Sequence, residues 1–248
     1  MQRRTFALVV LIVLVLPFAS TAQMTYRLKG TVKDNDGKAV PGARVRAEAL
    51  TGFRGEQFVG QKEFATKTND KGDWTILGLT SGVWAFEATG DDVVPQVVVL
   101  PINFTNRQPQ GVTGNSFRWD LPLTVRRSTH AGLNAAAAAA TEGRLADAIT
   151  SVGLVAGEPD SDLLCSAGEV ALLVRQHGLA GAIFEQILKQ DSKHGCATRG
   201  RSSAALMQND FDTAAKMLWR AIELVPREQR AALGAAVKDL QGIAGFKN

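Results

Sequence analysis

Three histidines and two cysteines are the residues in this chain best suited to bind a metal or act as nucleophiles. His130, His177 and His194 lie far apart, and none belongs to an HExxH pair, the spacing that places two imidazoles on one helix face. Catalysis requires several such groups to converge. The sequence therefore predicts no catalytic, cofactor-binding or metal-binding residues, no cofactor and no enzyme activity. His177 stands at the end of an expected helix, where we predict that it acts as a cap.

Two pairs of aspartates are the remaining candidates for a cation site. Asp34 and Asp36 lie in the stretch KDNDGKAVPGARV, and Asp91 and Asp92 follow Gly90. A calcium loop needs a longer run of alternating oxygen ligands that ends in a bidentate glutamate. Because Asp and Asn also bond their own backbone in tight turns, we predict a hairpin turn for the first pair. For the second pair we predict a solvated loop.

Cys165 and Cys196 are the two cysteines, and both lie in the alanine-rich second half of the chain. Their separation is close to one period of the helical repeat described below, so equivalent helices could bring them together. In an oxidising compartment such a pair forms a disulfide. The alternative is two isolated thiols buried where small residues pack, and the sequence leaves both open.

The charge balance excludes one class of partner. The formal net charge is +4, and Arg3 and Arg4 contribute half of it. Nucleic-acid binding usually needs a clustered basic face. The rest of the chain is nearly neutral and has no such cluster, so there is no reason to expect a nucleic acid as partner.

The N-terminus has the pattern of a signal peptide. Arg3 and Arg4 precede the apolar run FALVVLIVLVL, which is far shorter than the roughly 20 residues that span a bilayer. Ser20 and Ala22 occupy the two positions that a signal peptidase recognises. We predict general secretion, cleavage after Ala22 and a periplasmic or extracellular protein with no stable membrane span after cleavage. A twin-arginine signal and an uncleaved anchor are the alternatives.

Residues 23–126 are predicted to form a β domain. In YRLKGTV, ARVRAEAL, DWTILGL and VWAFEAT, apolar and polar residues alternate, which is the period of a strand with one buried face. Turn signals such as DNDG and NDKG fall between these runs. The pattern predicts an antiparallel β-sandwich of about seven strands.

Residues 127–248 are predicted to form a helical repeat domain. Ala146, Ala180 and Ala214 recur with a period of 34 residues, each after an expected helix break. Such a period indicates paired helices that stack to bury a shared apolar face. The last segment, REQRAALGAAVKDLQGI, is predicted to be a capping helix. The chain as a whole is thus expected to be a multidomain β + α protein.

The β half resembles the carboxypeptidase regulatory-like domain, a transthyretin-like (prealbumin-like) sandwich also grouped with carbohydrate-binding-like folds. The resemblance is carried by GTVKDNDGKAVPGARV, from Gly30 to Val45, and by TNDKGDWTILGLTSGVW, from Thr68 to Trp84. The segment from Gly52 to Phe64 is longer than this family usually needs and is expected to form a protruding hairpin. The helical half, residues 131–226, resembles tetratricopeptide repeats. That second resemblance implies binding of peptides or proteins without chemistry.

Aromatic residues bear on sugar binding, which requires exposed aromatic platforms. The alternation places Trp74, Trp84, Trp119 and Tyr26 on the buried face, and Trp219 is expected in a packed helix. The aromatics left for loops are Phe53, Phe58 and Phe104.

Together these patterns predict a non-catalytic exported protein of the cell envelope that acts as a protein-protein interaction or scaffold module. A protein or peptide partner would bind the concave surface of the helical repeats, or alternatively an edge strand of the sandwich. The alternative function is a carbohydrate-binding module, with a glycan as its ligand.

Overall fold

The computed structural model describes residues 26–52, 57–58, 60–103, 118–225 and 227–243. The predicted signal peptide with its cleavage site, and the loop residues Phe53 and Phe104, lie outside these ranges. The expected hairpin from Gly52 to Phe64 lies partly outside them. Within the described residues, no helix is both long enough and apolar enough to cross a membrane.

The described strands form two sheets. One sheet has the order β4-β1-β7, with β8 also paired to β1, and the other has the order β3-β2-β5-β6. Strands β7 and β8 run parallel to β1, whereas the other pairs are antiparallel. The strand bounds are β1 Tyr26–Lys33, β2 Arg44–Thr51, β3 Glu63–Lys67, β4 Asp73–Leu79, β5 Gly82–Thr89, β6 Gln96–Ile102, β7 Arg118–Asp120 and β8 Leu123–Thr124.

The predicted alternation holds in the strands that face solvent on one side. In β2 and β4, buried residues alternate with more exposed ones, as a half-buried strand requires. Trp74 and Phe86 pack against each other between the two sheets, with ring centroids 6.5 Å apart. Strands β5 and β6 differ, because nearly every residue in them is buried. Their second face is therefore covered as well.

Seven helices in the described part of the chain follow the strands, so the protein is a mixed β + α protein. Their bounds are α1 Ala131–Thr141, α2 Leu145–Val155, α3 Ser161–Leu173, α4 His177–Gln190, α5 Gly195–Met207, α6 Phe211–Leu224 and α7 Arg227–Ile243. The fourth residues of α2, α4 and α6 are Ala148, Ala180 and Ala214, and all three are fully buried. The predicted register is thus wrong in the first unit, where Ala148 and not the exposed Ala146 takes the equivalent place.

Helices α3, α4 and α5 pack closely around one aromatic ring. A Cβ atom on Gly168 of α3 or on Gly200 of α5 would lie 2.5 Å or 2.3 Å from the ring of Phe184 in α4. A side chain at either position would force this fully buried ring to move. Nearby, Cys165 of α3 and Cys196 of α5 form a disulfide, which decides between the two alternatives left open by the sequence.

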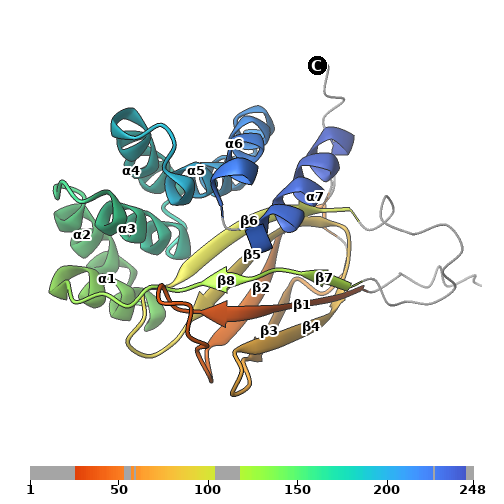
Figure 1. Cartoon of the computed structure of the whole chain (residues 1–248), viewed down its shortest axis with the longest axis horizontal. Coiled ribbons are helices and arrows are strands. Elements are labelled where there is room, and N and C mark those ends of the chain that lie inside the picture. The colour runs from red at the N-terminus through yellow and green to blue at the C-terminus, as the bar shows by residue number, and fades with distance from the viewer. Residues whose placement is uncertain (1–25, 53–56, 59, 104–117, 226, 244–248) are drawn as a thin grey trace, which may run out of the picture.

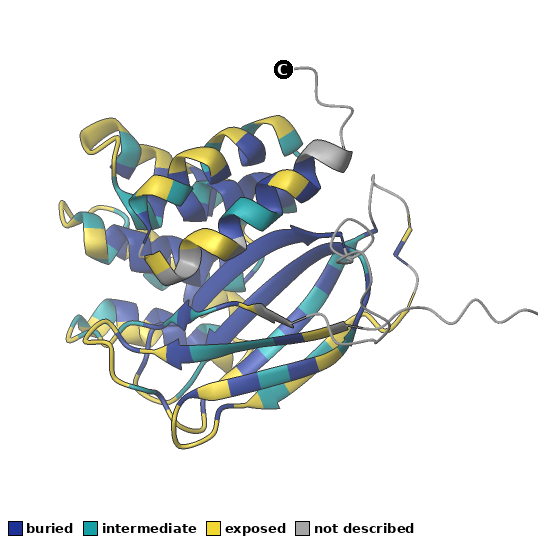
Figure 2. Cartoon of the chain, turned by 45° about the vertical axis from the view of Figure 1, so that its right-hand side comes forward, coloured by how far each residue is buried: buried dark blue, intermediate teal, exposed yellow. Residues whose placement is uncertain are grey.

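The helices stack beside the sheet β3-β2-β5-β6, and α3, α5 and α7 pack on β6 (Figure 1). Figure 2 shows the buried residues of these strands and helices gathered where the two halves meet. One hydrophobic cluster runs through both halves, from Leu28 to Leu240. The faces of α3, α5 and α7 that contact β6 are thus covered by the chain's own strand. The predicted partner and the predicted domain boundaries stay predictions.

Strand β6 ends its sheet, and the helices complete its hydrogen bonding. The amide of Val97 donates to Glu169 Oε2 at 2.8 Å, and that of Val99 donates to Ser203 Oγ at 3.1 Å. The amide of Asn103, the residue that follows β6, donates to Asp239 Oδ2 at 2.9 Å. The three acceptors come from α3, α5 and α7 in turn. We call Glu169, Ser203 and Asp239 the edge clamp, since an uncovered edge strand leaves such amides unpaired.

A charged cluster joins the halves at a second place. Arg175, in the turn between α3 and α4, pairs with Glu48 of β2 and, at 2.6 Å, with Glu87 of β5. Arg46 also pairs with Glu87, at 3.1 Å. The Glu87 side chain is nearly inaccessible to solvent, so these arginines provide the compensation that a buried carboxylate needs.

The edge clamp predicts a stability cost for Ser203→Ala. The variant leaves the buried Val99 amide without an acceptor, which costs about 1–3 kcal/mol. Ser166→Ala is the matched control, because its buried hydroxyl donates only to the Asp162 carbonyl in the same helix. Urea unfolding of both variants should show a clearly larger loss for Ser203→Ala. Equal losses would contradict the clamp.

Candidate functional site

A polar cleft of about 770 Å³ lies where the strands lead into the first helices. It is formed by the segment between β8 and α1 together with the first turns of α3. The residues that line it are predominantly polar or charged: Asn35, Thr124, Arg126, Arg127, Ser128, Thr129, His130, Leu133, Asp160, Asp162, Leu163 and Ser166.

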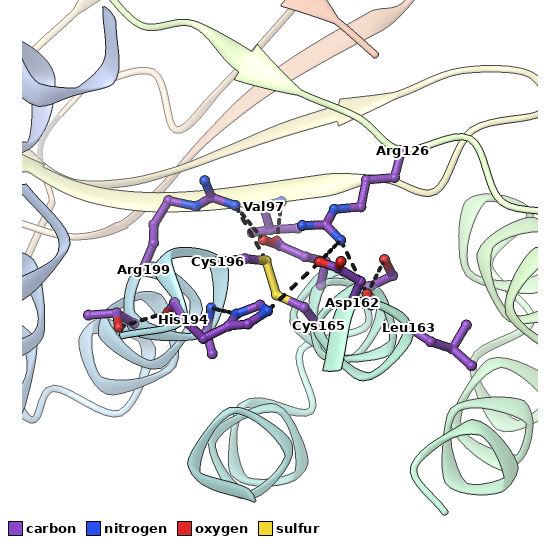
Figure 3. Close-up of a disulfide and its surroundings, with 12 residues drawn as sticks. Val97, Arg126, Asp162, Leu163, Cys165, His194, Cys196 and Arg199 are labelled. Atoms are coloured by element: carbon purple, nitrogen blue, oxygen red, sulfur yellow. Dashed lines mark hydrogen bonds and ion pairs between the residues drawn. A yellow bond between two sulfur atoms is a disulfide. The ribbon is translucent and has the colours of Figure 1, made fainter. Parts of the chain in front are cut away.

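Arg126 is held by both its backbone and its side chain. Its backbone forms an isolated bridge with Val94, just before β6. Its Nη1 donates to the Asp162 carboxylate at 2.9 Å and to the Asp162 carbonyl at 3.2 Å (Figure 3). The first turn of α3 therefore fixes the position of this guanidinium at the cleft wall.

Arg127 is anchored by the turn that begins at Asp34. The turn forms as predicted, but it does not join a hairpin of β1 and β2, because these strands lie in different sheets. Arg127 Nε donates to Asp34 Oδ2 at 3.2 Å, and the Arg127 amide donates to Asn35 Oδ1 at 3.0 Å. Asp34 Oδ1 accepts the amides of Asp36 and Lys38, so the carboxylate closes the predicted turn. Burial raises the pKa of Asp34, but the amides of Lys38 and Asp36 and the Arg127 guanidinium outweigh it and hold that pKa below its ordinary value.

Two histidines cap helices, but not the one for which capping is predicted. His130 is the N-cap of α1, and its Nδ1 accepts the Leu133 amide at 3.1 Å. His194 is the N-cap of α5, and its Nδ1 accepts the Ala197 amide at 3.2 Å. His177 is the first residue of α4, whose N-cap Gln176 makes no side-chain cap bond. The prediction for His177 is wrong, and His130 is the histidine that lines the cleft.

The cleft presents hydrogen-bond donors. Within the described residues, the side chain of Arg127 bonds through Nε and that of Arg126 through Nη1, which leaves further N–H groups on both guanidinium ions. Because His130 Nδ1 accepts a bond, its neutral ring carries the proton on Nε2. Hydroxyls of Ser128 and Thr129 line the same cleft. The arrangement suits an oxyanion that accepts several hydrogen bonds.

Other candidate residues are not brought together. Asp91 and Asp92 are exposed in a turn, as predicted for a solvated loop. In the described part of the chain, no group of three or more His, Cys, Asp or Glu side chains could hold a metal ion. A second cavity, of about 620 Å³, lies over β1 and β4, and its Lys29 already pairs with Asp120 at 3.1 Å.

Two of the aromatic predictions are wrong. Phe58 is buried edge-on against Trp84, with ring centroids 5.2 Å apart, and is not a spare loop aromatic. Trp219 is 58% exposed on α6 and does not lie in a packed position. Trp74 and Trp84 are buried as predicted.

No protein-family profile matches the chain, and no curated protein does. Among solved structures, the chain is similar to catechol 1,2-dioxygenase from Acinetobacter sp., with 14% identity, a TM-score of 0.33 and coverage of 44% of this chain and 55% of that one. Catechol 1,2-dioxygenase from Pseudomonas arvilla is 11% identical, with a TM-score of 0.35 and coverage of 46% of this chain and 56% of that one. The dioxygenase domain of a dioxygenase and carbohydrate-binding protein fusion from Streptomyces sp. is 15% identical. Its TM-score is 0.32, and the match covers 44% of this chain and 84% of that one.

These matches correct two predictions. The sequence predicts a non-catalytic interaction or scaffold module, with a carbohydrate-binding module as alternative, and no enzyme activity. The solved structures that match are instead enzymes, so the prediction of a protein without enzyme activity is wrong on this comparison. The chain spans little more than half the length of the two catechol dioxygenases. At these identities and TM-scores, the matches assign neither a reaction nor a substrate to this chain.

The lowered pKa of Asp34 predicts a pH-dependent effect of Asp34→Asn. Above pH ~3.9, the pKa of an unfolded aspartate, the native carboxylate is charged and stabilises the fold. We expect the variant to unfold at lower urea concentration at pH 7, and the difference to shrink as the pH falls below ~3.9. Asp36→Asn, an exposed change in the same turn, should have little effect at either pH. A difference for Asp34→Asn that stays constant down to pH 2 would contradict this role.

Proposed function

We propose that this protein is exported from the cytoplasm and binds a small molecule bearing a carboxylate or phosphate group in the cleft between β8, α1 and α3. In this proposal the two sheets form a sandwich of the carboxypeptidase regulatory-like type, and the helix pairs are tetratricopeptide-like repeats. The motif from Gly30 to Val45 supports the first assignment. The matched positions of Ala148, Ala180 and Ala214 support the second.

The observation that carries the ligand proposal is that two arginines, Arg126 and Arg127, line one cleft. Arg126 and Arg127 are each fixed by one carboxylate and keep N–H groups unused within the described residues. Guanidinium bonds to carboxylate and phosphate oxygens are among the stronger hydrogen bonds in proteins. The ligand's anionic group is therefore expected to accept hydrogen bonds from these arginines.

The charge balance of the cleft limits the ligand. Asp162 and Asp34 offset the two arginines, so the site does not attract a highly charged ion by its net charge. Donors from Ser128, Thr129 and His130 extend the polar lining beyond the arginines. A molecule with one anionic group on a polar body fits this lining best.

Export is supported by the disulfide and by the N-terminal pattern. Disulfides persist in oxidising compartments outside the cytoplasm, and Cys165 is bonded to Cys196. The run from Phe6 to Leu16 and the small residues Ser20 and Ala22 fit a cleaved signal.

Mass spectrometry of the protein purified from its native host tests the export proposal. We expect a mature N-terminus at Gln23, found outside the cytoplasm. A chain that starts at Met1 and is recovered from the cytoplasm would contradict it.

Calorimetric titration tests the ligand proposal, with inorganic phosphate and succinate as separate probes that distinguish the two anionic groups. We expect saturable binding of at least one probe and a loss of about 10-fold or more in affinity for Arg127→Gln, since a charged hydrogen bond contributes about 1.5–3 kcal/mol. Arg144→Gln is the control, because Arg144 is an equally exposed arginine held by Glu142 and Asp147. Absence of saturable binding, or equal binding by both variants, would contradict the proposal.

A further inference from the structure

We propose that Cys196 is a site of thiol–disulfide exchange, at which an external thiol or disulfide forms a mixed disulfide with the protein. The proposal concerns the disulfide between α3 and α5 and does not depend on a ligand in the cleft. It rests on three observations: the unequal burial of the two sulfur-bearing residues, a small cavity at one of them, and the positive charge beside it.

Access distinguishes the two cysteines. Cys165 is fully buried in α3, whereas Cys196, the second residue of α5, is half-buried. Cys196 also lines a cavity of about 160 Å³ together with Gln96, Thr124, Arg126, Gly195, Arg199, Leu224 and Val225. Because exchange requires a nucleophile to reach a sulfur atom, access favours attack at Cys196.

In the reduced protein, positive charge favours the thiolate form of Cys196, the nucleophile that attacks an external disulfide in the oxidising direction of the exchange. Arg199 Nη2 lies 3.9 Å from Cys196 Sγ, and Arg126 lines the same cavity (Figure 3). Cys196 also lies in the first turn of α5, where the helix dipole favours negative charge. Basic neighbours and helix N-termini are the features that make a cysteine reactive.

Three other titratable groups, Glu169, His194 and Asp162, lie near this disulfide and contribute to the electrostatic potential around it. Glu169 of α3 accepts a bond from Arg199 at 3.1 Å. Burial raises the pKa of Glu169, although Arg199 and the Val97 amide act against this. His194, the N-cap of α5, lies with its Nε2 3.8 Å from Asp162 Oδ1. Arg199 and the helix N-terminus remain the features that act directly on the Cys196 sulfur.

The exchange proceeds in two balanced steps. A thiolate RS⁻ attacks Sγ of Cys196 and forms a new S–S bond while the bond to Cys165 breaks. Cys165 leaves as a thiolate and takes up the proton that the incoming thiol released. A second RS⁻ then attacks the external sulfur of the mixed disulfide, which releases RSSR and the Cys196 thiolate. Two thiols are oxidised and the protein disulfide is reduced, and the reverse sequence oxidises the protein.

Peptide mapping of the native wild-type protein tests the site of attack without any substitution. The protein is incubated with reduced glutathione in the absence of denaturant, quenched with acid and analysed by mass spectrometry. We expect the glutathione adduct on Cys196. An adduct on Cys165, or no adduct until urea unfolds the protein, would overturn the proposal.

Two single-cysteine variants test reactivity separately. With oxidised glutathione, Cys165→Ser should form the mixed disulfide at least about 100-fold faster than Cys196→Ser, because a buried structural thiol is inert. The pH dependence of iodoacetamide alkylation of Cys165→Ser should give Cys196 a pKa below the ~8.5 of an ordinary thiol. Circular dichroism confirms that each variant is folded before its rate is used. Equal rates, or an ordinary or raised pKa, would contradict the proposal.

Discussion

The outward amides of β6 impose the constraint on which the rest of the structure depends. This strand ends its sheet, yet nearly all of it is buried, so its amides cannot turn to bulk water. An unpaired buried amide costs about as much as a lost hydrogen bond. Glu169, Ser203 and Asp239 supply the acceptors. They come from α3, α5 and α7, the three helices that pack along β6. The helices and the sheet are therefore needed to complete each other.

The packing of the helices on β6 also fixes the positions of the polar cleft and of the disulfide between Cys165 and Cys196. At the start of β6, the Gln96 side chain accepts the Thr124 amide at 2.6 Å, and Val94 bridges to Arg126, so the chain enters the cleft in a fixed position. On the helical side, Arg199 reaches Glu169 of the edge clamp and also Cys196. The anion cleft and the exchangeable disulfide thus lie next to the start of β6, where strands and helices meet.

Local patterns in the sequence predicted the local structure. Period-two alternation identified β2 and β4, DNDG identified the turn at Asp34, and the alanine-rich composition of the second half identified helices, although the predicted repeat misplaced the first unit. Contacts between distant residues could not be predicted in this way. The link from Asp34 to Arg127 and that from Glu169 to Val97 depend on how the halves pack, and a single sequence holds no signal for the distant residue that a side chain bonds. Phe58 and Trp219 were misplaced for the same reason, because packing and not local pattern decides their burial.

Native-state hydrogen exchange at the amides of Val97 and Val99 tests the edge clamp most directly. If the helices and the sheet complete each other, these amides should exchange only through global unfolding, with the same free energy as the amides of β5. Exchange of Val97 and Val99 at a free energy several kcal/mol lower, while β5 stays protected, would mean that the helices separate from an intact sheet. That result would contradict the account.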